Sequence, residues 1–233
     1  GTSLSHMPAV QDHKRAYEED KGPNTGGMGT YSDSDHSLPF LENSHIRSAQ
    51  KINEKTASAL KDKFGEGYKG ILYGGFIATA AGVQLIEYNA RFGDPEAMNV
   101  LSILKTDLID ICIAILDEAL DTLDITFHNM ATVCKYAVPD GYPDNPTKNE
   151  QIDISAVDDP EKLFHASVEL KDKDLVQIGS RAVAFVGTGE TIWEAEKIAE
   201  KEISKVKGPL FHRRDIGTTD LIQKKINHMA SLK

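Results

Sequence analysis

Two strand-like runs joined by a very short segment are the feature that most constrains the fold of this chain. Gly70–Thr79 and Val83–Asn89 have strand character, and Ala80–Gly82 between them predicts an antiparallel hairpin. Apolar residues recur at helical spacing before the hairpin, from Asn43 to Phe64, and after it, from Pro95 to about Leu120. Because locally paired strands stand between helices, the sequence predicts an α+β fold.

A second block of strands begins near Ala131, and turn-rich stretches such as Pro139–Pro146 separate its strands. Its strand candidates are Ala131–Val138, Phe164–Leu170 and Arg181–Val186. Thr191, followed by Glu194 at the third position after it, forms a capping box, which predicts that a helix begins there. The pattern places a boundary between Leu120 and Ala131. We therefore expect two parts, residues 1–125 and residues 126–233.

The charge balance narrows the classes of partner. Lys and Arg number 26, Asp and Glu 36, and the formal net charge is −10. This balance argues against a nucleic-acid surface and against binding to an anionic membrane, because both require a positive field. No run approaches the ~20 apolar residues of a membrane helix, and no signal peptide is visible. We expect a cytoplasmic protein that binds neither nucleic acid nor membranes.

The two cysteines, Cys112 and Cys134, both lie in apolar runs. We interpret them as two buried thiols, with a disulfide as the less favoured alternative. Free thiols are typical of a reducing, intracellular compartment.

Glu87 and Asn89 form the first candidate site. Alternate residues of a strand share a face, so both follow Val83 and Leu85 on one side of the second hairpin strand. A carboxylate and an amide carbonyl at a strand end are ligands that Mg²⁺ accepts, with waters and substrate phosphates completing its shell. The alternative is that the strand leaves the core after Leu85 and that both side chains are only solvated.

Arg91 and Asp94 follow directly. An arginine near a metal could stabilise a phosphoryl group in transfer, or it could form an ion pair with Asp94 or Glu96. Asp94 also stands where a helix N-cap belongs, with Pro95 at the first helical position. In the helix that follows we expect a break near Lys105–Asp107.

The first forty residues have little periodicity and are interpreted as loop. Within them Gly26–Gly29 could bring backbone N–H groups close to an anion, although no Walker pattern follows. A flexible turn is the equal alternative. Lys14, Arg15 and Lys21 nearby are either cations of the site or a solvated run. His13 has no second histidine at a zinc spacing, so we do not expect a metal there.

The basic cluster His212–Asp215 near the C-terminus is the last candidate. We interpret it as a surface group of ion pairs, unless a phosphate docks there.

Taken as ordered strings, these segments resemble a known family. Met7–Arg15 (MPAVQDHKR) and Gly22–Ser32 (GPNTGGMGTYS) are similar to the central segment of phosphoribosylamine–glycine ligases, also called glycinamide ribonucleotide synthetases. Ile86–Glu96 (IEYNARFGDPE) resembles the metal-binding strand and loop of that family. Gly141–Pro143, Arg181–Val186 and Arg213–Gly217 resemble its C-terminal domain. The resemblance covers nearly the whole chain.

The resemblance implies a reaction in purine biosynthesis. ATP, glycine and 5-phosphoribosylamine give ADP, phosphate and glycinamide ribonucleotide, by way of glycyl phosphate. In this picture Glu87 and Asn89 hold Mg²⁺ or Mn²⁺, and Arg91 acts on the phosphoryl group in transfer. The residues expected to shape the substrate side are Asp12, Lys14, Gly26, Gly27, Gly29 and Asp94, with the N–H groups of the glycine loop facing an anionic substrate.

The resemblance also implies that part of the active site is absent. Family members begin with an N-terminal domain and with ATP-grasp subdomains that hold ATP, and this chain starts midway through the ATP-grasp fold. Residues 1–125 would be the C-terminal portion of the ATP-grasp domain, and residues 126–233 a smaller C-terminal domain. We expect little or no activity from the chain alone, self-association through exposed apolar surface, and the missing N-terminal half as its partner.

Two rival interpretations stay open. The chain could be a non-catalytic subunit that binds a separately encoded N-terminal half, or part of another ATP-grasp ligase with a different acceptor. The start at Gly1 without methionine and the entry within the fold favour a fragment. The Gly22–Ser32 string argues against a different acceptor.

Overall fold

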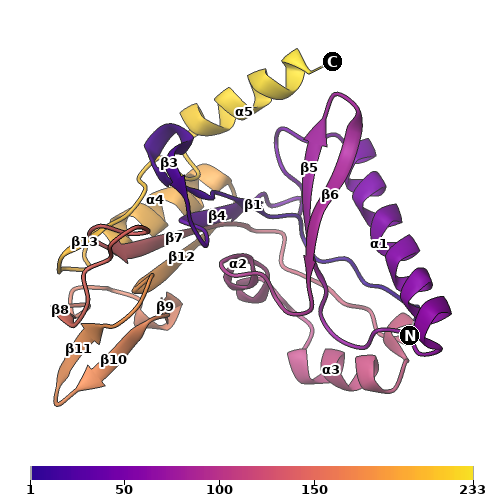
Figure 1. The fold of residues 1–233 in the computed structure, drawn as a ribbon, viewed down its shortest axis with the longest axis horizontal. Helices are drawn as coiled ribbons and strands as arrows, with labels where there is room; N and C mark the ends of the chain where they lie inside the picture. The colour runs from indigo at the N-terminus through magenta and orange to yellow at the C-terminus, as the bar shows by residue number, and fades with distance from the viewer. Residues whose placement is uncertain (1, 233) are drawn as a thin grey trace.

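The computed structural model describes residues 2–232 and has an α+β architecture (Figure 1). Strands β5 (Tyr73–Thr79) and β6 (Gly82–Asn89) pair antiparallel, which confirms the predicted hairpin. Helix α1 (Asn43–Phe64) runs along the hairpin, where the Tyr88 hydroxyl donates to Asn53 Oδ1 at 2.7 Å. The helix confirms the periodicity of the sequence.

The core of the molecule is a six-stranded sheet in which every neighbouring pair is antiparallel. Its strand order is β1-β4-β7-β12-β9, and β13 pairs with β7. The strands are β1 (Gln11–Asp12), β4 (Gly29–Ser32), β7 (Ala131–Pro139), β9 (Leu163–His165), β12 (Val183–Gly189) and β13 (Leu210–Phe211). Strands β7 and β12 carry most of the fully buried apolar side chains.

Two helices pack on this sheet. Helix α4 (Ile192–Ile203) lies against β7 and β12 and begins at the expected cap, because Thr191 Oγ1 accepts from the Glu194 N–H at 3.2 Å. Helix α2 (Glu96–Ser102) packs on β4, β7 and β12. Its buried Asn99 accepts from Thr30 and donates to Thr132 Oγ1 at 2.9 Å, so α2 is fixed over two strands of the sheet.

The remaining elements lie outside the hairpin and the central sheet. They are β2 (Arg15–Tyr17), η1 (Glu18–Asp20), β3 (Lys21–Asn24), α3 (Leu108–Leu116), η2 (Leu120–Thr122), β8 (Glu150–Ile152), η3 (Pro160–Lys162), β10 (Val168–Lys171), β11 (Asp174–Gln177) and α5 (Thr219–Ser231). Strands β10, β11 and β8 form a separate three-stranded sheet, and β2 pairs with β3. The chain breaks between α2 and α3, as expected, and Asp107 caps α3 by accepting from the Ile109 N–H.

Four local expectations were wrong. The first forty residues contain β1 to β4 instead of only loop: β2 pairs with β3, β1 pairs with β4, and β4 also pairs with the distant β7. The run Phe164–Leu170 is divided between β9 and β10, which belong to different sheets. Asp94 does not cap α2, because its carboxylate accepts from Tyr136 and Arg181 instead. Cys112 is exposed, and only Cys134 is buried; both are free thiols.

The expected boundary near residue 125 falls between η2 and β7. Nevertheless, the central sheet takes β1 and β4 from one side of it and β7, β9, β12 and β13 from the other. Residues 1–125 and 126–233 therefore share one sheet, and their division into two domains stays a proposal. Within residues 2–232, no helix combines the length and the apolar character needed to cross a membrane.

Candidate functional site

The end of β6 holds the candidate metal ligands. Glu87 and Asn89 lie two residues apart on this strand, and Asn89 Nδ2 donates to Glu87 Oε1 at 3.3 Å. This contact leaves the Asn89 carbonyl and the second carboxylate oxygen free to accept other ligands. Glu87 is exposed and Asn89 is half-buried. The pair is thus accessible from solvent, as both a metal site and the solvated alternative require.

The donor chemistry fits a hard divalent cation. Carboxylate and amide oxygens suit Mg²⁺, which commonly takes only one or two protein ligands and is completed by water and phosphate oxygens. Among residues 2–232, no group of three or more His, Cys, Asp or Glu side chains could enclose a metal. A cation at Glu87 and Asn89 would therefore depend on a phosphate-bearing substrate for the rest of its ligands.

Arg91 stands beside the pair but forms neither of the expected ion pairs. Its Nη1 donates to the Phe92 carbonyl at 2.6 Å, and the side chain is exposed. Asp94 is engaged by Arg181, and Glu96 accepts from the Tyr73 hydroxyl at 2.6 Å. The guanidinium of Arg91 keeps most of its donors for a ligand.

Asp12, at the end of β1, and the nearby Lys14 form the second group of candidate residues. Lys14 Nζ is 2.5 Å from Asp12 Oδ2, and the Asp12 side chain is only 10% exposed. Burial, together with the nearby carboxylate of Glu96, raises the pKa of Asp12 to about 6 against the opposing charge of Lys14. In reverse, Asp12 raises the pKa of Lys14 against the effect of its own partial burial. Asp12 therefore titrates near neutral pH and Lys14 stays charged.

Tyr73 lies between the candidate metal ligands on β6 and the pair of Asp12 and Lys14. It belongs to β5 opposite Asn89, and its hydroxyl holds the buried Glu96 at the start of α2. Burial raises the pKa of Tyr73, and the carboxylates of Glu96, Asp12 and Glu87 raise it further. The same phenol thus lies within the field of both the metal candidate and Asp12.

The glycine loop does not present its N–H groups as expected. The Gly26 N–H donates to the Tyr142 hydroxyl, the Gly27 N–H to Thr25 Oγ1 and the Met28 N–H to the His13 carbonyl, at 2.9 to 3.0 Å. The donors that a ligand would meet here are instead the side chains of Lys14 and Arg181, which donate to the loop carbonyls.

The backbone conformation explains why glycine occupies two of these positions. Gly27 has φ +122°, and a Cβ there would overlap Pro95. Gly29 has φ +152°, and a Cβ there would overlap the carbonyl of Cys134 on β7. These positive φ values are poorly accessible to other residues. The close approach of the loop to α2 and to β7 therefore requires glycine at both positions.

Arg181 is the site residue that the sequence did not single out for this role. Its Nη2 is 2.7 Å from Asp94 Oδ2, its Nη1 donates to the Gly27 carbonyl at 3.1 Å, and its guanidinium lies 4.4 Å from the centre of the Tyr136 ring. Tyr136 in turn donates to Asp94 Oδ1 at 3.0 Å. The residue lies 87 positions from Asp94 along the chain, so no local pattern could have indicated the contact.

Two further sequence candidates have buried side chains. His13 is buried, and burial lowers its pKa to about 3, so its ring is neutral. Arg213 is 1% exposed, which corrects the expectation of a surface cluster: it forms ion pairs with Asp20 and Asp215, both at 2.8 Å. This arginine holds η1 and the C-terminal segment together.

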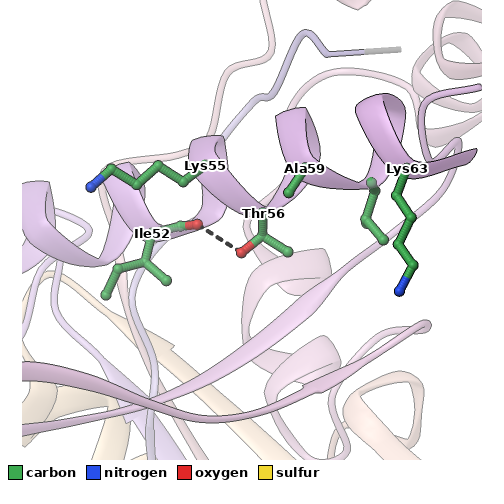
Figure 2. A pocket seen from close by; sticks show the side chains of 6 residues that line it. Ile52, Lys55, Thr56, Ala59 and Lys63 are labelled. Carbon is green, nitrogen blue, oxygen red and sulfur yellow. Dashed lines mark hydrogen bonds between the residues drawn. The ribbon is translucent and has the colours of Figure 1, made fainter. Parts of the chain in front are cut away.

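Neither of the two hollows described for this structure coincides with the site. A groove of about 320 Å³ follows α1 and is lined by Ile52, Lys55, Thr56, Ala59, Leu60 and Lys63 (Figure 2). A second, of about 280 Å³, lies beside His212 and Phe211. Glu87, Asn89, Asp12 and Lys14 line neither of these two hollows.

Comparison with known proteins shows two consecutive matches to one family. Residues 1–97 match the ATP-grasp (A) domain of phosphoribosylglycinamide synthetase, and residues 132–219 match its C domain. The two matches fall on either side of the expected boundary and include every candidate site residue.

Individual relatives agree with these matches. The chain is 52% identical to the phosphoribosylamine–glycine ligase of Methanosarcina acetivorans over 100% of its own length and 53% of the relative, and 52% identical to that of Methanobrevibacter smithii with the same coverage. The crystal structure of the Thermotoga maritima enzyme matches with a TM-score of 0.77 and 29% identity, over 90% of this chain and 51% of that one. The chain spans about half the length of the curated relatives it matches.

Proposed function

Since the chain belongs to the phosphoribosylglycinamide synthetase family, we propose that it forms the metal-binding and acceptor-side part of a phosphoribosylamine–glycine ligase. The complete reaction would join glycine to 5-phosphoribosylamine at the expense of ATP, giving glycinamide ribonucleotide, ADP and phosphate. The proposed location is the cytoplasm, where the other steps of purine biosynthesis would supply the acceptor.

The observation that carries the proposal is the placement of Glu87 and Asn89 beside the Asp12, Lys14 and Arg181 group. The two groups are connected through Tyr73 and Glu96. Such an arrangement suits a reaction in which a nucleotide phosphate and a second substrate must meet.

Each residue has a proposed role. Glu87 and Asn89 would hold Mg²⁺ or Mn²⁺, which neutralises charge on the ATP phosphates when bound. Arg91, with donors to spare, would contact the phosphoryl group in transfer. Lys14 would attract an anionic group of the substrate, and Asp12, whose pKa is about 6, could accept a proton from an attacking amine.

The proposed role of Arg181, Asp94 and Gly27 is to hold the glycine loop in position on the substrate side. The ion pair of Arg181 with Asp94 and its bond to the Gly27 carbonyl fix the loop against the start of α2. Gly26 and Gly29 contribute through the backbone, Gly29 by allowing β4 to approach β7. These contacts support positioning of the loop more than direct binding of an anion by its N–H groups.

The chain alone is proposed to be inactive. In the described residues the hairpin β5–β6 is a two-stranded sheet without further strands, and such sheets are marginal without additional cover. The ATP site of an ATP-grasp enzyme has two walls, and this chain would supply one. Binding must offset the lost freedom of the ligand, so half a site should bind ATP weakly.

A direct product assay tests the proposal. The chain would be incubated with ATP, Mg²⁺, glycine and phosphoribosylamine, both alone and as a chimaera joined to the part of the Methanosarcina acetivorans ligase that it does not match. We expect glycinamide ribonucleotide, detected by mass spectrometry, from the chimaera only. A chimaera that forms ADP only with another acceptor would instead support a different ATP-grasp ligase.

A further inference from the structure

Helix α3 exposes an apolar stripe that nothing in the described structure covers. Its exposed side chains are Leu108 (37% exposed), Ile109 (69%), Ile113 (51%) and Leu116 (66%), together with the free thiol of Cys112. These positions follow each other at helical spacing, so they share one face of the helix. In α3 only Ile111 is buried, and the helix lies at the lower edge of the molecule in Figure 1, away from the central sheet.

The stripe is bordered by acidic residues. Exposed carboxylates before, within and after the helix are those of Asp107, Asp110, Asp117, Glu118, Asp121 and Asp124. Lys69 neutralises Glu118 at 2.9 Å, and Lys105 is the basic residue of this segment. An apolar centre with a charged rim is the usual anatomy of a protein interface, and here the rim is negative.

This charge argues against a second copy of the chain as the occupant. Two copies meeting through α3 would bring like-charged rims together, which opposes association. The helix has nine residues and is about 14 Å long, too short to bury on its own the ~800 Å² per partner of a stable interface. The occupant should therefore contact more of this chain than α3 alone, and it should carry basic side chains around an apolar surface.

The relatives indicate which polypeptide this is. They match the chain over its whole length at about half identity, yet the chain accounts for only 53% of their length. We propose that the α3 stripe is the docking surface for the part of the ligase that this chain does not contain, and that this part meets it with an apolar surface rimmed by Lys and Arg. The inference rests on the proposed function, because it assumes the same complete enzyme.

Cys112 provides the readout, since it lies in the middle of the stripe and is exposed. The second thiol, Cys134, is fully buried, and burial raises its pKa, so it serves as an internal unreactive control. N-ethylmaleimide modification of each cysteine would be followed by peptide mass spectrometry in the chain and in the chimaera described above. We expect modification of Cys112 to slow by about tenfold or more in the chimaera.

Two matched variants distinguish loss of docking at α3 from the effect of adding a charge elsewhere on the surface. Ile109→Asp places a charge on the stripe, and Leu170→Asp places one on β10, at a residue with the same 69% exposure. In the chimaera, Ile109→Asp should restore the reactivity of Cys112, whereas Leu170→Asp should leave it protected. Because both side chains are exposed, both variants should retain the far-ultraviolet circular dichroism of the parent.

The outcomes distinguish this inference from the proposed function. Equal reactivity of Cys112 in the chain and in an active chimaera would overturn the docking surface and leave the function standing. Protection of Cys112 in a chimaera that makes no glycinamide ribonucleotide would support the surface and count against the function. Protection that rises with the concentration of the chain alone would mean that a second copy covers α3, which also overturns the inference.

Discussion

At the scale of single residues, the site is held by charges that are distant in sequence. Arg181 reaches both the Gly27 carbonyl and Asp94, and Tyr136 closes the arrangement by donating to Asp94. Neighbouring Asp12 is buried with Lys14 as its nearest cation. Buried charged groups of this kind often reduce the stability of the fold.

Asp12 should therefore destabilise the folded chain at neutral pH. Burial raises its pKa from 3.8 to about 6, so the folded state favours the protonated acid, and stability is lost as the pH rises from about 4 to about 6. The shift corresponds to about 3 kcal/mol as an upper bound, since Asp12→Asn also removes the partner of Lys14. Urea unfolding should show Asp12→Asn to be more stable than the parent at pH 8 and to lose that advantage at pH 4.

The contrary result would be an Asp12→Asn variant that is less stable than the parent at pH 8. It would mean that the ion pair with Lys14 outweighs the burial of Asp12. Lys14→Gln serves as the control, because it removes the opposing charge and should make the pH dependence steeper.

Lys135 is a buried cation with a purely structural role. It points from β7 to Glu196 at 2.7 Å and Glu200 at 2.8 Å, and its side chain is fully buried. Although burial opposes it, hydrogen bonds from His212 and Lys135 lower the pKa of Glu200 to about 2. Lys135→Met should cost about 3 to 5 kcal/mol, because it leaves two carboxylates without their shared partner.

Urea unfolding at pH 7 measures this loss. Lys201→Met is the matched control, since Lys201 also pairs with carboxylates but is 65% exposed, and exposed pairs contribute little. Equal effects of the two substitutions would show that the buried network does not stabilise the sheet.

At the scale of elements, the hairpin β5–β6 differs from the central sheet. Strands β7 and β12 are paired on both sides and covered by α4, whereas the hairpin has α1 along it and two strands only. Its apolar Ile77, Leu85 and Ile86 are exposed at 49%, 38% and 65%. The strand that carries Glu87 and Asn89 thus belongs to a part of the fold with less pairing and cover than the central sheet.

Amide hydrogen exchange should reveal this difference. We expect the hairpin amides to exchange through local opening well before those of β7 and β12, because local stability follows burial and pairing. In the chimaera the hairpin should become protected, while β7 and β12 change little. Protection of the hairpin equal to that of β7 in the chain alone would contradict this account of the element.

The elements also show what the sequence could predict. The hairpin, α1, the break before α3 and the start of α4 follow from local signals of periodicity, turn and cap, and all are confirmed. The short strands β1 and β4 could not be predicted, since two to four residues carry no periodicity. Strand β4 depends on pairing with the distant β7, and β1 depends on pairing with β4. The ion pair of Arg181 with Asp94 depends on the same long-range pairing.

At the scale of the whole molecule, one sheet joins the two family regions. Residues 1–97 and 132–219 match separate domains, yet β4 pairs with β7 along four residues. The proposed substrate side, with Asp12, Gly27 and Arg181, therefore takes residues from both regions. Loss of residues 132–219 would remove Arg181, whereas loss of residues 1–97 would remove every site residue that the resemblance implied.

The central claim is that the end of β6 supplies the metal ligands of an ATP-dependent ligase. Its most direct measurement is Mg²⁺-dependent ADP formation, with glycine and phosphoribosylamine, by the chimaera carrying Glu87→Gln, compared with the chimaera carrying Glu169→Gln. Both glutamates are exposed, so neither substitution should affect folding. We predict a loss of about 100-fold or more for Glu87→Gln and no change for Glu169→Gln; full activity of Glu87→Gln would contradict the account.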